Sequence, residues 1–218
     1  MRSPKKHKIH ELFIPLIILT LVLWFLYRRL FMFPVWFDET IGKAIFFGLP
    51  TWLYVTSTGF RTVIDTFSTP KLRPGLLRGL AVGGLFGFVT LFLRLWQRQG
   101  TVIFVPVFFA DVFWWEALLA LFTAFWETLF FYSFVMSVIM DRFEHWKLSK
   151  QVTATALIFM LFHIPNIFLR FSGEQVIVLL LLLTLFSVGQ ALLFARNRNA
   201  YTLILSHTLW GLSLLIYW

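Results

Sequence analysis

The chain lacks cysteine altogether and has few charged residues. Its 218 residues include no Cys, and only 13% are Asp, Glu, Lys or Arg. Without cysteine, disulfides, thiolate-bound metal centres and cysteine nucleophiles are all excluded. Soluble domains average about 25% charged residues, so this composition indicates a membrane protein.

Long hydrophobic runs dominate the sequence, which is 59% hydrophobic and 20% aromatic. Because a membrane crossing needs about 20 apolar residues, we expect an all-α fold, a polytopic transmembrane helical bundle of about seven spans. The expected spans are 12–33, 41–59, 77–96, 114–140, 152–170, 175–195 and 199–217. Segment 101–113 is too short for its own crossing and either extends the fourth span or lies along the interface. The aromatic residues are interpreted mainly as lipid-facing bulk and interfacial anchors.

The net charge of +9 is consistent with nucleic-acid binding by itself, but the placement of the basic residues argues against it. The 19 Lys and Arg fall mostly in short breaks between apolar runs, where they orient a membrane protein. A cytoplasmic N-terminus puts most of them on the cytoplasmic side and leaves a minority, including Lys43, on the other side. The opening "MRSPKKHK" precedes a long apolar run without an A-x-A-like site, so we expect an uncleaved first span. The predicted partner is thus the lipid bilayer, in a prokaryotic cytoplasmic membrane or alternatively an organellar one.

Three ionisable residues lie well inside expected spans, on three different helices: Glu127, His163 and His207. At 1.5 Å per residue they lie at similar depths in the membrane. A carboxylate at the bilayer centre costs roughly 2.5–3.5 kcal/mol, and such residues usually face the bundle interior and pair with one another. The remaining acidic residues, Asp38 and Glu39 among them, are assigned to loops or span ends. We therefore expect Glu127 and the two histidines to form one polar site.

The residue types at this site indicate hydrolytic chemistry. A glutamate can take a proton from water and return it to a leaving group, while histidines position that water, stabilise an oxyanion or bind zinc. The same three side chains would suit a three-ligand metal site with an open position, so zinc is possible, although no cofactor is favoured. Ser133 and Ser206 lie nearby without forming a convincing Ser-His-Asp set. The alternative interpretation is that the three residues of the site are structural hydrogen-bonding groups between helices, but three such residues at one depth, with no others in any span centre, favour a functional site.

Three short motifs carry a resemblance to a known family: "ETLFFYS" (127–133), "FMLFH" (159–163) and "HTLWG" (207–211). They are similar to the E-E-x-x-x-R, F-x-x-x-H and H-x-x-x-N motifs of the CPBP family of intramembrane proteases. That family includes the CAAX prenyl endopeptidases and the Abi, or bacteriocin-processing, proteins. The resemblance covers about residues 110–217, which divides the chain into N-terminal transmembrane helices (1–100) and a protease core (101–218).

The resemblance implies a function and a role for each site residue. Glu127 would be the base that activates water without metal, and His163 and His207 would position the water and stabilise the oxyanion. The substrate would be a membrane-proximal peptide or protein, with its identity, the need for prenylation and the oligomeric state left open.

The chain also departs from the family motifs. Thr128, Tyr132 and Gly211 stand where the family has the second Glu, the Arg and the Asn. Tyrosine cannot replace the fixed cation of arginine, and a lost oxyanion donor can cost roughly 10²–10³ in turnover. Asn166, three residues after His163 on much the same helix face, is the candidate for the missing amide. Thr128, Tyr132 and Asn166 are therefore expected to support the substrate or the oxyanion.

Two other functions remain open alternatives to an intramembrane endopeptidase. One is a catalytically silent relative that binds a membrane partner or peptide and uses the polar cluster to hold its helices together. The lost motif residues favour it, and the retained Glu and histidines oppose it. The other is a transporter or proton relay, but no pair of interrupted helices marks a transport site.

Overall fold

The computed structural model describes residues 10–97, 112–170 and 172–217, and the described chain is helical throughout. The elements are α2 (Phe13–Leu30), α3 (Val35–Phe37), η1 (Asp38–Gly42), η2 (Ala44–Gly48), α4 (Leu49–Thr58), α5 (Thr62–Asp65), η3 (Thr69–Lys71), α6 (Leu72–Gln97), α7 (Phe113–Glu127), η5 (Thr128–Met136), α8 (Ser137–Arg142), α9 (Leu148–Arg170), α10 (Glu174–Asn197) and α11 (Ala200–Tyr217). Elements η1, η2 and η5 are π-helical, and η3 is a 3₁₀ turn. The expected all-α class is confirmed.

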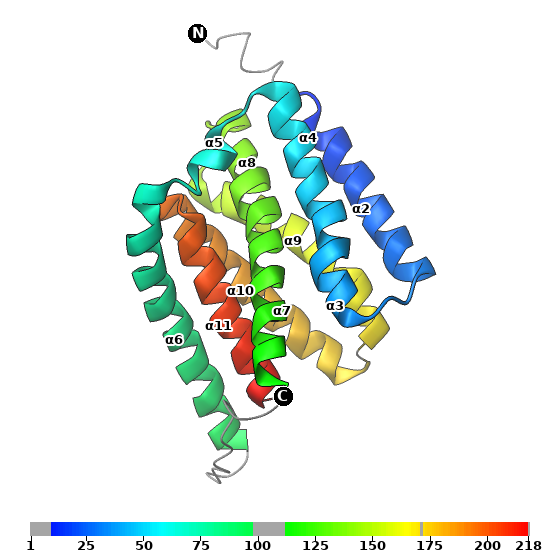
Figure 1. Cartoon of the computed structure of the whole chain (residues 1–218), viewed down its shortest axis with the longest axis vertical. Coiled ribbons are helices and arrows are strands. Elements are labelled where there is room, and N and C mark those ends of the chain that lie inside the picture. Colours follow the sequence, from blue (N-terminus) through cyan, green and yellow to red (C-terminus); the bar gives the residue numbers. More distant parts are fainter. Residues whose placement is uncertain (1–9, 98–111, 171, 218) are drawn as a thin grey trace.

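The elements join into seven long helical columns. The run from α3 to α4 forms one column and the run from α7 to α8 another, beside α2, α6, α9, α10 and α11. Five described helical stretches are long and apolar enough to cross a membrane, so the chain is an integral multi-pass membrane protein. Figure 1 shows the start of α2 and the end of α11 at opposite ends of the bundle, as an odd number of crossings between them requires. The basic N-terminal segment and residues 98–111, which include most of segment 101–113, lie outside the described residues.

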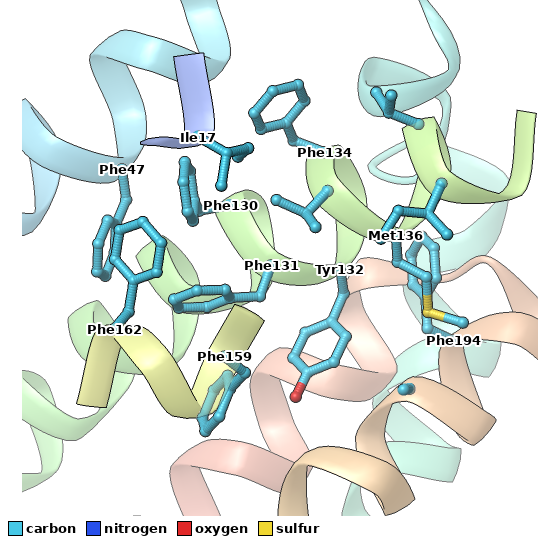
Figure 2. Close-up of a cluster of buried hydrophobic side chains, with 14 of the residues drawn as sticks. Ile17, Phe47, Phe130, Phe131, Tyr132, Phe134, Met136, Phe159, Phe162 and Phe194 are labelled. Carbon is cyan, nitrogen blue, oxygen red and sulfur yellow. The ribbon is translucent and has the colours of Figure 1, made fainter. Parts of the chain in front are cut away.

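The central column carries Glu127 and is packed by aromatic rings on several sides. In η5, Phe130, Phe131, Tyr132 and Phe134 are fully buried. Figure 2 shows rings from other columns against them, with Phe47 stacked on Phe130 at 5.0 Å between centroids. Each such aromatic pair contributes about 0.5–1.5 kcal/mol beyond its buried area. The phenylalanines of η5 are therefore core residues, an exception to the general interpretation of the aromatic residues as lipid-facing bulk.

A stripe of glycines brings α6 against α11. A Cβ on Gly79 would lie 2.8 Å from the Thr202 carbonyl oxygen, and one on Gly83 would lie 2.6 Å from Leu209 Cδ1. Gly75, one turn earlier, meets α11 in the same way. In a membrane, such small residues permit close helix packing where no hydrophobic force drives association. Since α11 carries His207, this contact sets the position of that histidine; Figure 1 shows α6 and α11 side by side.

The second column begins earlier than the expected span 41–59. It is helical from Val35, so Asp38, Glu39 and Lys43 lie within it and not in a loop. Charges in its first turns weaken the apolar signal, but the protein pairs them: the Tyr27 hydroxyl donates to Asp38 at 2.5 Å. Asp38 also pairs with Arg28 of α2. Asp38 and Glu39 therefore lie near a span end, one of the two expected places, but inside the helix and not in a loop.

Close approach between this second column and α7 depends on Gly48. A Cβ at this position would lie 2.6 Å from Cζ3 of the Trp126 ring. Trp126 directly precedes Glu127, so the second column passes close to the predicted site.

Candidate active site

Glu127 lies at the junction between α7 and the π-helical segment η5, with 4% of its surface exposed. Helical turns of this widened kind occur frequently at functional sites. Its Oε2 atom lies 3.5 Å from Nε2 of His163 on α9 and 3.7 Å from Nε2 of His207 on α11. The structure thus brings together the three residues that the sequence analysis expects at similar membrane depth.

The orientation of His163 is fixed by its own helix. Its Nδ1 atom lies 2.8 Å from the carbonyl oxygen of Phe159, which can only accept a hydrogen bond. A neutral His163 therefore carries its proton on Nδ1 and turns the Nε2 lone pair toward Glu127. The Phe159 ring stacks on the imidazole at 4.0 Å between centroids and holds it in this plane.

His207 has the opposite hydrogen-bonding arrangement. Its Nδ1 atom is buried without a hydrogen-bond partner in the part of the chain that the structure describes. Its Nε2 atom faces the Glu127 carboxylate, an acceptor, so a neutral ring gains by carrying its proton on Nε2. The Phe186 ring lies 4.7 Å away between centroids and limits rotation of the imidazole. Beside the same carboxylate oxygen, neutral His163 therefore presents a lone pair and neutral His207 presents an N–H donor.

Lys43 is a member of the site that the sequence analysis missed. Its Nζ atom donates to Oε1 of Glu127 at 2.6 Å and lies 2.5 Å from Oε2 of Glu39, which is one helical turn earlier. The hydroxyl of Thr123 donates to the same Glu39 oxygen at 2.6 Å. A sequence signal existed: Glu followed by Lys four residues later is a stabilising pair on a helix. That spacing in an apolar segment could have indicated an internal pair.

For the three predicted supporting residues, the structure shows burial but, in the described chain, no hydrogen bond from the groups that would act. Thr128 and Tyr132 are fully buried, and neither hydroxyl has a hydrogen-bond partner among the described residues. The Tyr132 ring packs between Phe159 and Phe194. The buried carboxamide oxygen of Asn166 likewise lacks a partner in the described ranges. Roles for these residues in supporting substrate or oxyanion stay predictions.

The two nearby serines have structural hydrogen bonds. The Thr66 hydroxyl donates to Ser133 at 2.9 Å, and the Gln190 amide donates to Ser206 at 3.0 Å. Both serines are fully buried, so these bonds tie neighbouring elements together.

The positive charge of Lys43 opposes a metal ion bound to Glu127. The described residues contain no group of three or more His, Cys, Asp or Glu side chains arranged to hold a metal ion. A divalent cation at Glu127 would also lie close to the Lys43 ammonium, whose positive charge opposes it. The Lys43 charge thus disfavours zinc at Glu127, but the metal-free site stays a prediction, and no reaction step is assigned to a metal.

Comparison with known proteins identifies the C-terminal part of the chain. Residues 108–213 match the family model described as type II CAAX prenyl endopeptidase Rce1-like. No curated protein and no solved structure matches the chain significantly. The matched range contains Glu127, His163 and His207 but neither Glu39 nor Lys43. The resemblance to the CPBP proteases is confirmed.

Proposed function

Because residues 108–213 match the family model of type II CAAX prenyl endopeptidases, Rce1-like, we propose that the chain is an intramembrane endopeptidase that hydrolyses a peptide bond with water activated by Glu127. The observation that supports this proposal is the meeting of Glu127, His163 and His207 at one buried carboxylate oxygen. A buried acid, an acceptor imidazole and a donor imidazole form a complementary set for hydrolysis.

We place the attacking water beside Oε2 of Glu127, within reach of both histidine nitrogens. The gaps of 3.5 Å and 3.7 Å to the histidine nitrogens exceed an ordinary hydrogen bond. A water bound there donates one hydrogen bond to Oε2 of Glu127 and one to Nε2 of His163. Its oxygen is then free to approach the carbonyl carbon of a peptide.

The reaction follows from these contacts. Oε2 of Glu127 accepts a proton from the water as its oxygen bonds to the carbonyl carbon, and the carbonyl oxygen becomes an oxyanion. The Nε2–H of His207 donates a hydrogen bond to that oxyanion. Glu127 then returns the proton to the amide nitrogen, the C–N bond breaks, and a carboxylic acid and an amine form. The acid passes its remaining proton to the amine, so a carboxylate and an ammonium leave. Each proton is accounted for without a metal ion.

The substrate is a peptide or protein segment at the membrane. The family description names CAAX prenyl endopeptidases, so a farnesylated CAAX-type peptide is the appropriate probe. The bilayer itself concentrates a lipid-modified peptide beside the bundle, since each buried CH₂ contributes about 0.8 kcal/mol to membrane binding.

The test is cleavage of a fluorescent, quenched, farnesylated CAAX-type peptide by the purified protein in lipid vesicles. The wild type is expected to cleave it, and Glu127→Gln to lower kcat/KM by about 10²–10⁴-fold because the general base is lost. Glu116→Gln, in the first turn of the same helix, is the matched control and should retain activity. Equal cleavage by wild type and Glu127→Gln would remove Glu127 as the base. Stoichiometric zinc that is lost on His163→Ala would overturn the metal-free reaction.

A second candidate function is supported by the Lys43–Glu127 ion pair. This buried pair joins two helical columns, and such a network also suits a catalytically silent relative that binds a membrane partner. In that case the wild type cleaves neither farnesylated nor unmodified peptide, and Glu127→Gln lowers only thermal stability or complex assembly.

A further inference from the structure

Lys43 provides the cation that the family-matched part of the chain lacks at this site. Tyr132 occupies the arginine position of the motif, while the Lys43 ammonium reaches Glu127 from outside the matched range. We infer that Lys43, held by Glu39, is a positioning residue that aims Glu127 Oε2 at the two histidines and the attacking water. This inference rests on the proposed function and adds residues from the N-terminal half to its machinery.

The two oxygens of Glu127 have different partners. Oε1 accepts a charge-assisted hydrogen bond from Lys43 at 2.6 Å, whereas Oε2 faces His163 and His207. Such bonds are roughly twice as strong as neutral ones, so Oε1 is fixed and rotation of the carboxylate is prevented. The reactive oxygen is thereby held toward the position of the water.

Glu39 keeps Lys43 in place and leaves the site negative. One ammonium is shared between the Glu39 and Glu127 carboxylates, so these three groups carry one net negative charge. Glu127 therefore still has a charge with which to accept a proton. Thr123 lies on α7, one turn before Glu127, and its hydroxyl donates a hydrogen bond to Glu39. The network thus begins and ends on the same helix, which fixes its geometry.

If the Lys43–Glu127 ion pair only held the helices together, its loss would lower stability and leave kcat unchanged. A second buried ion pair on the same column provides a matched control. Arg28 and Asp38 form another buried ion pair with the second column, and neither contacts Glu127 in the described structure. Removing Arg28 weakens helix packing at the same column without changing the partner of Glu127 Oε1. Arg28→Met therefore reports the cost of losing a buried ion pair alone.

The experiment measures kcat and KM for the farnesylated peptide with Lys43→Met, Lys43→Arg, Glu39→Gln and Arg28→Met in lipid vesicles. Lys43→Met is expected to lower kcat by about 10²-fold, the effect of a misplaced reacting group, with KM little changed. Lys43→Arg should recover part of kcat, and Glu39→Gln should be intermediate. Because Glu39 acts through Lys43, kcat of the double variant Lys43→Met/Glu39→Gln should be no lower than kcat of Lys43→Met alone. Arg28→Met should lower thermal stability and retain kcat.

An infrared readout separates this inference from the proposed function. The carboxyl bands of Glu127 are isolated by subtracting the spectrum of a Glu127→Gln variant in each background. Loss of the Lys43 hydrogen bond is expected to shift these bands in Lys43→Met but not in Arg28→Met. Cleavage by the wild type with kcat retained in Lys43→Met would overturn the inference and leave the protease assignment intact. If the wild type cleaves no peptide but the bands shift, the protease assignment fails and the pairing of Lys43 with Glu127 stands.

Discussion

At the scale of single residues, His163 and His207 look equivalent in the sequence but differ in the hydrogen-bonding partners of their ring nitrogens. The Nδ1–H group of His163 donates a hydrogen bond to the Phe159 carbonyl oxygen, whereas Nδ1 of His207 has no partner among the described residues. Membrane depth alone could identify Glu127 and both histidines as a group. It could not identify Lys43, because a charged residue at the start of an expected span looks interfacial and its partner is 84 residues away.

The donor role of His207 predicts a specific kinetic change. His207→Ala is expected to lower kcat by about 10²–10³-fold with KM little changed, because an oxyanion donor acts mainly in the transition state. His207→Gln keeps an N–H donor and should recover part of that loss. Steady-state kinetics with the farnesylated peptide measure both variants. Wild-type kcat in His207→Ala would exclude an oxyanion role for this residue.

At the scale of helices, hydropathy finds the elements but not their neighbours. The expected span 77–96 lies within α6, which begins at Leu72, and 41–59 misses the first turns of the second column. Hydropathy does not predict that α6 packs against α11, because an apolar side chain is equally stable against lipid and against another helix. The spacing of Gly75, Gly79 and Gly83 was the available signal for that contact.

The close α6–α11 contact predicts different effects for two adjacent glycines. Gly83→Leu is expected to destabilise the fold by about 1–3 kcal/mol, as overpacking does, and to displace α11 with His207. Gly84→Leu is the control, since a Cβ there meets nothing within 4 Å. Thermal unfolding in detergent and kcat in vesicles measure the two variants. Equal effects at both positions would contradict the described helix packing.

At the scale of the whole molecule, the order of crossings could be predicted because each apolar run is long enough to span a bilayer. The seven described columns follow the expected order, and the start of α2 and the end of α11 lie at opposite ends of the bundle. The aromatic core around η5 could not be predicted, because a buried phenylalanine and a lipid-facing one have the same hydropathy. Several tryptophans, such as Trp52 and Trp114, are exposed as expected.

The predicted orientation can be mapped directly because the chain has no cysteine of its own. Met32, fully exposed between α2 and α3, and Ser149, exposed in the first turn of α9, lie at opposite ends of the bundle. With a cytoplasmic N-terminus, a membrane-impermeant maleimide should label Met32→Cys in intact cells. Ser149→Cys should react only after permeabilisation. The reverse labelling pattern would invert the topology.

The most direct test of the central claim, that Glu127 activates water for peptide hydrolysis, works whichever peptide the protein cleaves. Membranes from cells that contain wild-type protein or Glu127→Gln are incubated in H₂¹⁸O, and peptide termini are compared by mass spectrometry. The account predicts ¹⁸O-labelled carboxyl termini that appear with the wild type and are absent with Glu127→Gln at equal protein levels. The same set of labelled termini in both samples would contradict it.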